Sequence, residues 1–427
     1  MNMKMKKTFN KWVDSLLVES KKKITYIPMH DDVTGDLLKE EEIFFTDQKT
    51  LESRAVNEEN LLTPYMEEVT PIFDESGNYP VALKTSSQTA YLKVSRKMDK
   101  LEPLPIHAGC CPILTAIFVG PPSSGKTVHF LQLTDPMLHD MLARNTNISF
   151  QDDLPSTLER RQRYEQARRR FKNDKALPEP NRKDEFIEPY YFYVQNGDRR
   201  ALLRLIDIDG EQCSSMRWDN KRLLCTSNIF IITVGADELI AGERGEEVQY
   251  KRVVSQLLPR LKVLREDNDY EFRVLITKSD LLDWEHPALQ SVGENSVEVK
   301  DGHLRQTVHD KGFDYGVFNQ RSEAIQSYLR SECPNFYNQI VTSIPEVKIE
   351  FGAIASIGEE CKDGKFFNFQ PMWIDELILS ILAKEGLYPV SVPDEKRKPN
   401  EIEVETVKDT GKKLYAKLKN LMKTREV

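Results

Sequence analysis

Residues 113–127 read Ile-Leu-Thr-Ala-Ile-Phe-Val-Gly-Pro-Pro-Ser-Ser-Gly-Lys-Thr. The first seven are mostly apolar or β-branched, which predicts a buried strand over Ile113–Val119. The next eight, Gly120 to Thr127, match the pattern Gly-x-x-x-x-Gly-Lys-Ser/Thr in full, and a helical pattern follows. Glycines let the backbone wrap closely, so that successive N–H groups converge and the helix adds the positive end of its dipole. The stretch therefore predicts a phosphate-binding loop.

Each residue type in this loop has a chemical reason. Lys126 is expected to reach the β- and γ-phosphates, and Thr127 is expected to hold magnesium through its hydroxyl. The residues that we expect to contact the nucleotide here are Gly120, Ser123, Ser124, Gly125, Lys126 and Thr127. The alternative is an ordinary glycine-rich turn. That alternative does not explain why a strand pattern precedes the motif and a helical pattern follows it.

A second motif ends the apolar run Leu202–Ile208, where the chain reads Asp207-Ile-Asp209-Gly210-Glu211. A carboxylate at the end of this strand can bind magnesium, and we choose Asp207 over Asp209. Gly210 has no Cβ to block its N–H from a γ-phosphate, a contact that distinguishes a triphosphate from a diphosphate. We expect Lys126, Gly210 and Glu211 to take part in hydrolysis.

A third motif, Thr277-Lys278-Ser279-Asp280, follows the apolar run Phe272–Thr277. The carboxylate of Asp280 can accept hydrogen bonds from N1–H and the 2-amino group of guanine, two donors that adenine lacks. A site of this design discriminates by roughly 10⁴-fold. The stem of Lys278 is expected to pack along the base. Thr277, where Asn is usual, keeps a hydroxyl that can bond to the phosphate loop.

The last expected contact with the base comes after a fifth apolar run, Val347–Ile354, in the loop that begins Ala355-Ser356. A contact through a backbone N–H tolerates many side chains, so Ala355 and Ser356 complete the predicted guanine site. Trp284 is interpreted as a packing anchor, with bracing of the loop that carries Asp280 as the alternative.

The order of the apolar runs and helical patterns predicts βαβ units. Helical patterns cover about 127–142, 246–265, 321–331 and 373–386, and a further strand is expected over Ile229–Val234. We therefore expect an α/β fold of the P-loop NTPase type, with a mostly parallel sheet covered by helices on both faces. Because parallel sheets bind ligands at the carboxyl ends of their strands, the motifs should meet at one edge.

With these motifs the chain resembles the TRAFAC-class P-loop GTPases, and more narrowly the bacterial double-GTPase type of biological-conflict systems. The resemblance covers about Pro105 to Pro389. It implies a P-loop GTPase domain over 106–389, after an N-terminal β or irregular accessory region over 1–105 and before a charged tail over 390–427. Polar stretches at 143–200 and 285–318 are expected as insertions.

Departures from the class pattern bear on activity. The class implies a Thr that closes over magnesium, and the matching stretch here, 176–184, lacks one. Glu211 stands where a water-orienting Gln is usual. These departures leave open a slow GTPase switch, a nucleotide-bound assembly subunit that does not hydrolyse, and a P-loop ATPase. The Arg-rich stretch Leu158 to Lys172 is interpreted as a solvated helix face, with an arginine finger and a contact with RNA or DNA as the alternatives.

Composition limits location and partners. The 427 residues carry a net charge of −8, which disfavours nucleic-acid binding across the chain. None of the six cysteines forms a Cys-x-x-Cys pair, a usage typical of reduced thiols in the cytoplasm. No apolar run reaches the roughly 18 residues that a transmembrane helix needs. We therefore expect a cytoplasmic protein that binds GTP or GDP with Mg²⁺ and acts with partner proteins of the same system, with homo-oligomerisation left open.

Overall fold

The computed structural model places most of the chain between residues 24 and 392. It describes residues 24–30, 36–47, 50–51, 60–74, 78–86, 89–90, 92–97, 100–143, 146, 148–153, 158–178, 189–208, 210, 221–264, 270–290, 312–359, 361–367 and 369–392. Within these ranges, none of the helices combines the length and the hydropathy that crossing a bilayer requires. Residues 1–23 and residues 393–427, which make up all but the start of the charged tail, lie outside the described residues.

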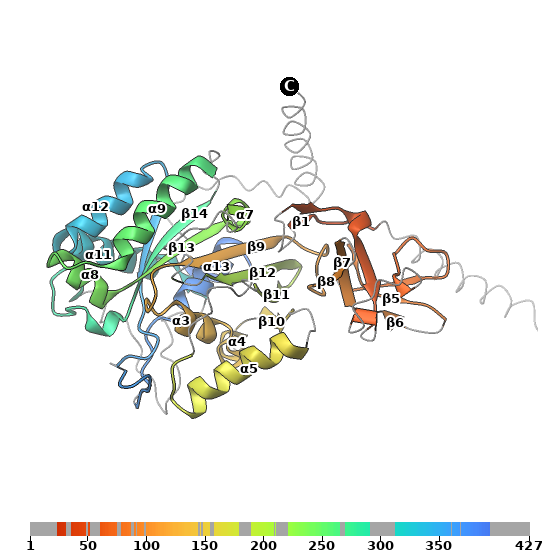
Figure 1. Cartoon of the computed structure of the whole chain (residues 1–427), viewed down its shortest axis with the longest axis horizontal. Helices are drawn as coiled ribbons and strands as arrows, with labels where there is room; N and C mark the ends of the chain where they lie inside the picture. The colour runs from red at the N-terminus through yellow and green to blue at the C-terminus, as the bar shows by residue number, and fades with distance from the viewer. Residues whose placement is uncertain are drawn as a thin grey trace, which may run out of the picture.

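A seven-stranded sheet forms the centre of the fold, in the order β10-β11-β12-β9-β13-β14-β16 (Figure 1). The strands are β9 (Ile113–Val119), β10 (Ile148–Asp152), β11 (Tyr190–Asn196), β12 (Arg199–Asp207), β13 (Ile229–Gly235), β14 (Glu271–Thr277) and β16 (Ile349–Ala353). The pairs β12–β9, β9–β13, β13–β14 and β14–β16 are parallel. β13 is buried along its whole length, as its apolar sequence predicts for a strand covered on both sides.

The prediction of a P-loop fold with a mostly parallel sheet is wrong, because the sheet is mixed and one end of it is antiparallel. β10 pairs with β11, and β11 with β12, in antiparallel register. Both added strands come from 143–200, which we expected to be an insertion outside the sheet. Only Gly197 and Asp198 separate β11 from β12, and so short a turn can join antiparallel neighbours only.

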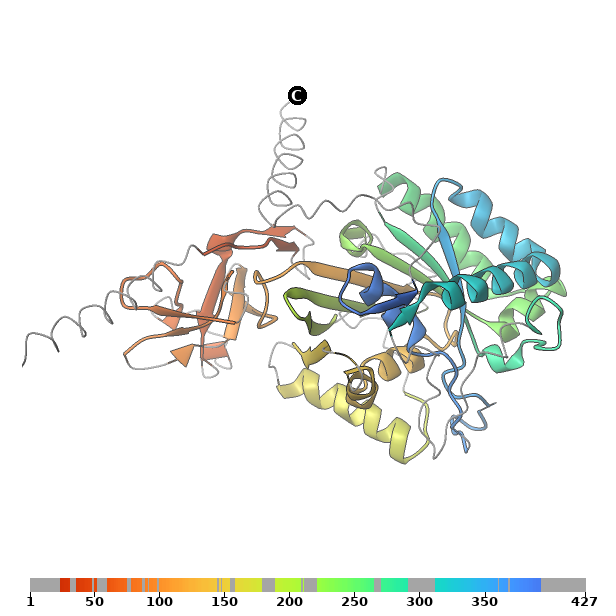
Figure 2. The ribbon, with the colours of Figure 1, turned by 180° about the vertical axis from the view of Figure 1, so that it is seen from behind.

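The helices gather in two groups (Figures 1 and 2). α8, α9, α11 and α12 lie beside the β13–β14–β16 part of the sheet, whereas α3, α4 and α5 lie beside its β10–β11–β12 part. Their bounds are α3 (Lys126–Leu133), α4 (Pro136–Ala143), α5 (Leu158–Asn173), α7 (Lys221–Thr226), α8 (Ala236–Glu243), α9 (Gln249–Leu264), α11 (Tyr315–Glu332), α12 (Pro334–Ser343) and α13 (Glu376–Lys384).

Local sequence explains where two of these helices begin. The single helix expected over 127–142 is divided into α3 and α4, because Pro136 lacks the N–H that a continuous helix would need and starts a new one. α11 begins earlier than the expected 321, since Asp314 caps it by accepting a hydrogen bond from the Val317 N–H over 3.1 Å. Its first residues were expected to be loop.

The N-terminal strands form three small antiparallel sheets at the end of the molecule farthest from α12 (Figures 1 and 2). The strands are β1 (Met29–His30), β2 (Leu37–Leu38), β3 (Ile43–Thr46), β4 (Thr70–Phe73), β5 (Pro80–Lys84), β6 (Thr89–Ala90), β7 (Leu92–Lys97) and β8 (Lys100–Leu104). They have an apolar core of their own that includes Phe45, Tyr79 and Leu83. Elsewhere, β15 (Phe313–Asp314) pairs in parallel with β17 (Val390–Val392).

Candidate functional site

The loop of residues 120–127 connects β9 to the first turn of α3. Gly125 precedes the helix in a left-handed conformation, with φ of 80°, and Ser123 is exposed at φ of 62°. The first turn of α3 carries no acidic residue. The helix therefore presents its N–H groups and the positive end of its dipole at the loop, an arrangement that suits an anion.

Lys126 places a positive charge at the centre of this loop. The side chain is buried, and its ammonium donates to the carbonyls of Gly120 over 2.9 Å and Pro121 over 2.8 Å, and to the Ser124 hydroxyl over 3.3 Å. The loop therefore wraps around its own lysine. A cation held beside the N-terminus of a helix suits a phosphate group.

Thr127 and Asp207 come together between α3 and β12. The Thr127 hydroxyl donates to Oδ2 of Asp207 over 2.7 Å, and Asp207 is the last residue of β12, in register with Phe118 of β9. A hydroxyl and a carboxylate are hard oxygen donors of the kind that magnesium prefers. The donor set thus fits a magnesium ion. Asp209, the second choice, lies outside the described residues.

The described ranges contain no cluster of three or more His, Cys, Asp or Glu side chains suited to a metal ion. Magnesium commonly keeps several waters and takes one or two protein oxygens together with phosphate oxygens. The pair formed by Thr127 and Asp207 therefore matches a metal that arrives with a phosphate ligand better than a resident structural metal.

Gly210 lies directly against the loop of residues 120–127. A Cβ added to Gly210 would come within 2.2 Å of the backbone nitrogen of Pro122, so that no larger residue fits without a backbone shift. This close approach brings the Asp207–Gly210 segment to the loop, as the second motif predicts. Glu211, expected to take part in hydrolysis, lies outside the described residues.

Three hydroxyl groups tie the ends of β13 and β14 to the loop. Thr277 at the end of β14 donates a hydrogen bond to the carbonyl of Ser124 and lies 3.3 Å from the carbonyl of Val234. The hydroxyls of Ser124 and Thr233 lie 3.1 Å apart. All of these hydroxyl-bearing residues are buried. The hydroxyl retained at position 277 thus makes the contact with the loop that the sequence predicts.

The segment that carries Asp280 is a short 3-10 helix, Ser279–Leu281, directly after β14. The Ser279 N–H donates to the carbonyl of Ile354 over 3.0 Å, which joins this segment to the end of β16. Trp284 Nε1 donates to the Ser279 carbonyl over 2.8 Å, so Trp284 braces the segment. Asp280 is half-buried, and burial raises the pKa of its carboxyl above the ordinary value.

The loop after β16 is held by α3. The carbonyl of Ser356 accepts a hydrogen bond from Nε2 of Gln132, and Ala355 exchanges backbone hydrogen bonds with Met372. Ala355 and Ser356 are buried. Of the two residues expected to contact a base through their backbone, Ser356 is therefore fixed to α3 and Ala355 to Met372.

Lys278 forms an ion pair with α8. It has a left-handed backbone, and its ammonium binds Oδ2 of Asp237 in the first turn of α8 over 2.5 Å. Sequence reasoning missed Asp237, and it also missed Thr233 and Gln132. The available signals were weak: Thr233 is a polar residue inside an apolar strand, and Gln132 lies among the buried apolar residues of α3.

Two basic residues of the Arg-rich helix α5 fasten it to the end of α3. Arg168 donates to the Thr134 carbonyl and lies 3.2 Å from the Tyr190 hydroxyl, and Lys172 pairs with Asp135 at 2.5 Å. Arg168 thus has a structural role rather than that of an arginine finger. The side chains of Arg160, Arg161 and Arg163 lie outside the described residues.

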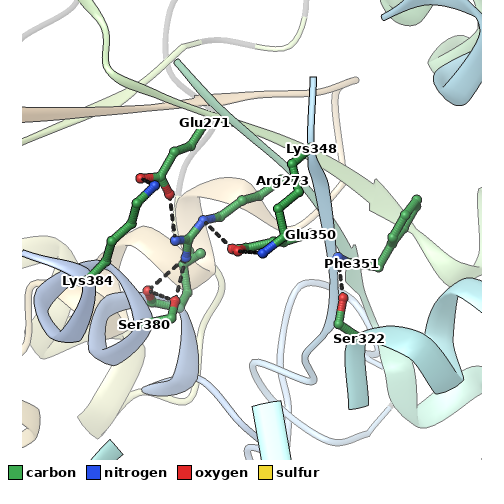
Figure 3. A network of polar contacts seen from close by, with 9 residues as sticks. Glu271, Arg273, Ser322, Lys348, Glu350, Phe351, Ser380 and Lys384 are labelled. Atoms are coloured by element: carbon green, nitrogen blue, oxygen red, sulfur yellow. Dashed lines mark hydrogen bonds and ion pairs between the residues drawn. The ribbon is translucent and has the colours of Figure 1, made fainter. Parts of the chain in front are cut away.

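A second polar cluster lies at the other end of β14, between β14, β16 and α13 (Figure 3). Buried Arg273 lies 3.0 Å from Glu271 and 3.3 Å from Glu350, and it donates to Ser380; Lys384 also pairs with Glu271. The charges balance within the cluster. A cavity of about 20 Å³ beside it has room for about one water molecule and not for a nucleotide. This cluster therefore anchors α13 to the sheet.

A scan against models of protein families and a search of curated proteins both gave no match for this chain. A fold in any case hosts many activities, so function has to be argued from the chemistry of the site.

Proposed function

We propose that this protein binds a guanine nucleotide with magnesium and hydrolyses GTP slowly as a regulatory switch. The observation that supports this most is the meeting of three motifs at one edge of the sheet. Thr127 contacts Asp207 across 80 residues of sequence, and Thr277 contacts Ser124 across 153. Motifs that match by chance are not expected to lie in contact in the folded protein, whereas the parts of one nucleotide site must lie close together.

In this proposal the loop of residues 120–127 binds the phosphates. The backbone N–H groups of Gly120, Ser123, Ser124 and Gly125 and the ammonium of Lys126 neutralise their charge. Thr127 and Asp207 hold the magnesium, which supplies charge compensation for the phosphate oxygens. The ammonium of Lys126 exchanges its present loop acceptors for phosphate oxygens.

Base selection is assigned to the segment after β14. Asp280 accepts hydrogen bonds from guanine, Lys278 covers one face of the base, and the N–H of Ser356 faces its carbonyl oxygen. The N–H of Ala355 already donates to the carbonyl of Met372 over 3.2 Å. The raised pKa of Asp280 follows from burial, and two donors from guanine would stabilise its ionised form. Thr277 sets the distance between this segment and the phosphate site.

Hydrolysis is proposed to be slow, roughly 10⁻⁴ per second without a partner, as is usual for this chemistry. Gly210 is placed to detect a γ-phosphate, and Glu211 follows it. A second candidate, a nucleotide-bound assembly subunit that does not hydrolyse, is favoured by two observations. The sequence over 176–184 has no Thr, and Arg168 is engaged by Thr134 and Tyr190.

The setting of the switch is proposed from the resemblance to bacterial conflict-system GTPases: a cytoplasmic multi-protein system, in defence or a related process. Cys110, Cys111 and Cys333 are buried free thiols, which supports a reducing compartment. The acidic net charge supports protein partners over nucleic acid.

Calorimetric titration of the purified protein with GTP and with ATP, in magnesium, tests the proposal. We expect a strong preference for GTP that Asp280→Ala removes. Asp283→Ala is the matched control, because Asp283 lies three residues further on in the same segment and is exposed. Mass spectrometry of the nucleotide that copurifies adds an independent result. Equal affinity of the wild-type protein for both nucleotides would overturn the proposal.

A further inference from the structure

An ion pair joins the base segment to α8 across the site. The Lys278 ammonium lies 2.5 Å from Oδ2 of Asp237, and the two side chains are 37% and 45% exposed. Ion pairs this exposed contribute little to stability, because solvent screens them and ordering two side chains costs entropy. The main effect of this contact is therefore to fix the position of the Lys278 side chain.

The backbone on both sides is shaped for this contact. Gly235, the last residue of β13, leaves the space: a Cβ there would lie 2.2 Å from Oδ1 of Asp237 and 3.6 Å from Cδ of Lys278. Any other residue at 235 would displace the carboxylate. Lys278 itself has φ of 53°, a left-handed conformation that is unfavourable for a residue with a side chain.

The pair also lies close to the proposed guanine reader. After the effect of burial, Lys278 lowers and Asp237 raises the pKa of Asp280, which places both charges within electrostatic reach of that carboxyl. The pKa of Glu238, the neighbour of Asp237, is raised by burial and by Asp237, whereas Lys278 and Lys126 lower it. Asp237 thus balances the Lys278 charge beside Asp280.

We propose that Asp237 is a positioning residue of the guanine site, which holds the Lys278 side chain extended over the face where the purine binds. The inference rests on the proposed function and adds to it a part of the site that none of the sequence motifs contains. A free lysine side chain populates many rotamers, and fixing one of them before binding lowers the entropic cost of binding.

This role has a recognisable signature. Lys278 would cover the ring of any purine, whereas Asp280 reads the groups on its edge. Loss of Asp237 should therefore weaken all purine nucleotides by the same factor. Loss of Asp280 should instead change the preference for GTP over inosine triphosphate, which lacks the 2-amino group.

The test measures the affinities of GTP and inosine triphosphate for full-length wild type, Asp237→Ala, Lys278→Met and the double variant. We expect Asp237→Ala to weaken both nucleotides by about 3–10-fold with an unchanged ratio. The double variant should be no weaker than Lys278→Met, because Asp237 acts through Lys278. Glu165→Ala, which removes a comparable exposed pair with Arg169 on α5, should change neither affinity. Asp237→Asn, of the same size, replaces Asp237→Ala if the latter fails to fold.

Four results would overturn the inference. If wild type binds GTP and the Asp237 variants bind it equally well, or if the losses in the double variant add, Asp237 does not act through Lys278, and the proposed function stands. A changed GTP-to-inosine ratio in Asp237→Ala would make Asp237 a reader of the base edge instead. If wild type binds neither nucleotide, the proposed function and this inference fail together.

Discussion

The hydroxyl of Thr127, in the first turn of α3, donates a hydrogen bond to Oδ2 of Asp207, the last residue of β12, over 2.7 Å. β12 and β9 are parallel neighbours, so the end of β12 lies beside the start of the loop that leads to α3. The contact therefore follows from strand order as well as from the two side chains. It places both proposed magnesium ligands on rigid elements, which is where a metal site needs them.

Replacing either partner should remove the dependence of GTP binding on magnesium. For Thr127→Ala and Asp207→Asn we expect the gain in affinity that magnesium gives the wild type to fall by about 10–100-fold. Titrations with GTP in the presence of magnesium and in the presence of EDTA measure this gain in affinity. Thr342→Ala, an exposed threonine on α12, is the control and should leave the gain intact. A magnesium gain that survives in both site variants would exclude this pair as the metal site.

Thr277→Val should lower both stability and nucleotide affinity. Valine keeps the shape of threonine but leaves the buried Ser124 carbonyl without its donor, at a cost of about 1–3 kcal/mol. Urea denaturation and GTP titration measure the two effects. Thr277→Asn should recover part of each, because its amide can donate in the same direction. If Thr277→Val behaves like wild type in both measurements, the hydroxyl does not hold the loop.

Asp280→Asn should change the preferred base from guanine to xanthine. The carboxamide offers an N–H donor to the 2-oxo group of xanthine and loses the acceptor that the 2-amino group of guanine needs. We expect the ratio of GTP to xanthosine triphosphate affinities to change by roughly 10²–10⁴-fold. Competition between the two nucleotides measures it, with Asp283→Asn as the control. An unchanged ratio would mean that Asp280 does not face the base.

The sequence predicted which segments lie together at the candidate site better than it predicted the strand order of the sheet. Local sequence patterns were enough to predict β9, whose observed bounds are the predicted ones. They were also enough to predict the loop after β9, because the strand, turn and helix preferences of these residues agree with one another. The antiparallel end of the sheet was missed because 143–200 was judged by its Arg-rich helix. The aromatic run Tyr190–Val194 is a strand signal that could have corrected this.

The pairs that join distant segments could not be predicted in the same way. Asp237 with Lys278 and Gln132 with Ser356 each depend on which strands become neighbours, and no local pattern encodes that. Each of these residues has an ordinary local interpretation, as an exposed charge or a polar residue on a helix. Only the strand order β9-β13-β14-β16 brings them together.

A buried carboxyl away from the site should make stability depend on pH. Glu376 on α13 is buried and lies 3.0 Å from Arg321 of α11. Burial raises its pKa to about 7, although Arg321 acts in the opposite direction. The folded state therefore holds a proton that the unfolded chain releases near pH 4.5. This contribution to stability is complete below the unfolded pKa and is lost as the pH rises through about 7.

Urea denaturation at about pH 5 and about pH 8 tests this, with a wild-type loss of unfolding free energy of about 1–3 kcal/mol expected between them. Glu376→Gln cannot titrate, so its unfolding free energy should change less over the same interval. At about pH 5, where Glu376 carries its proton, the variant has the same charge as the wild type at this position, so the difference between the two pH values decides. Glu246→Gln, an exposed position, should keep the wild-type difference. If Glu376→Gln shows the same difference in unfolding free energy between the two pH values as the wild type, Glu376 does not hold the proton. Glu376 is then ionised in the folded state, and its attraction to Arg321 exceeds the effect of burial on its pKa.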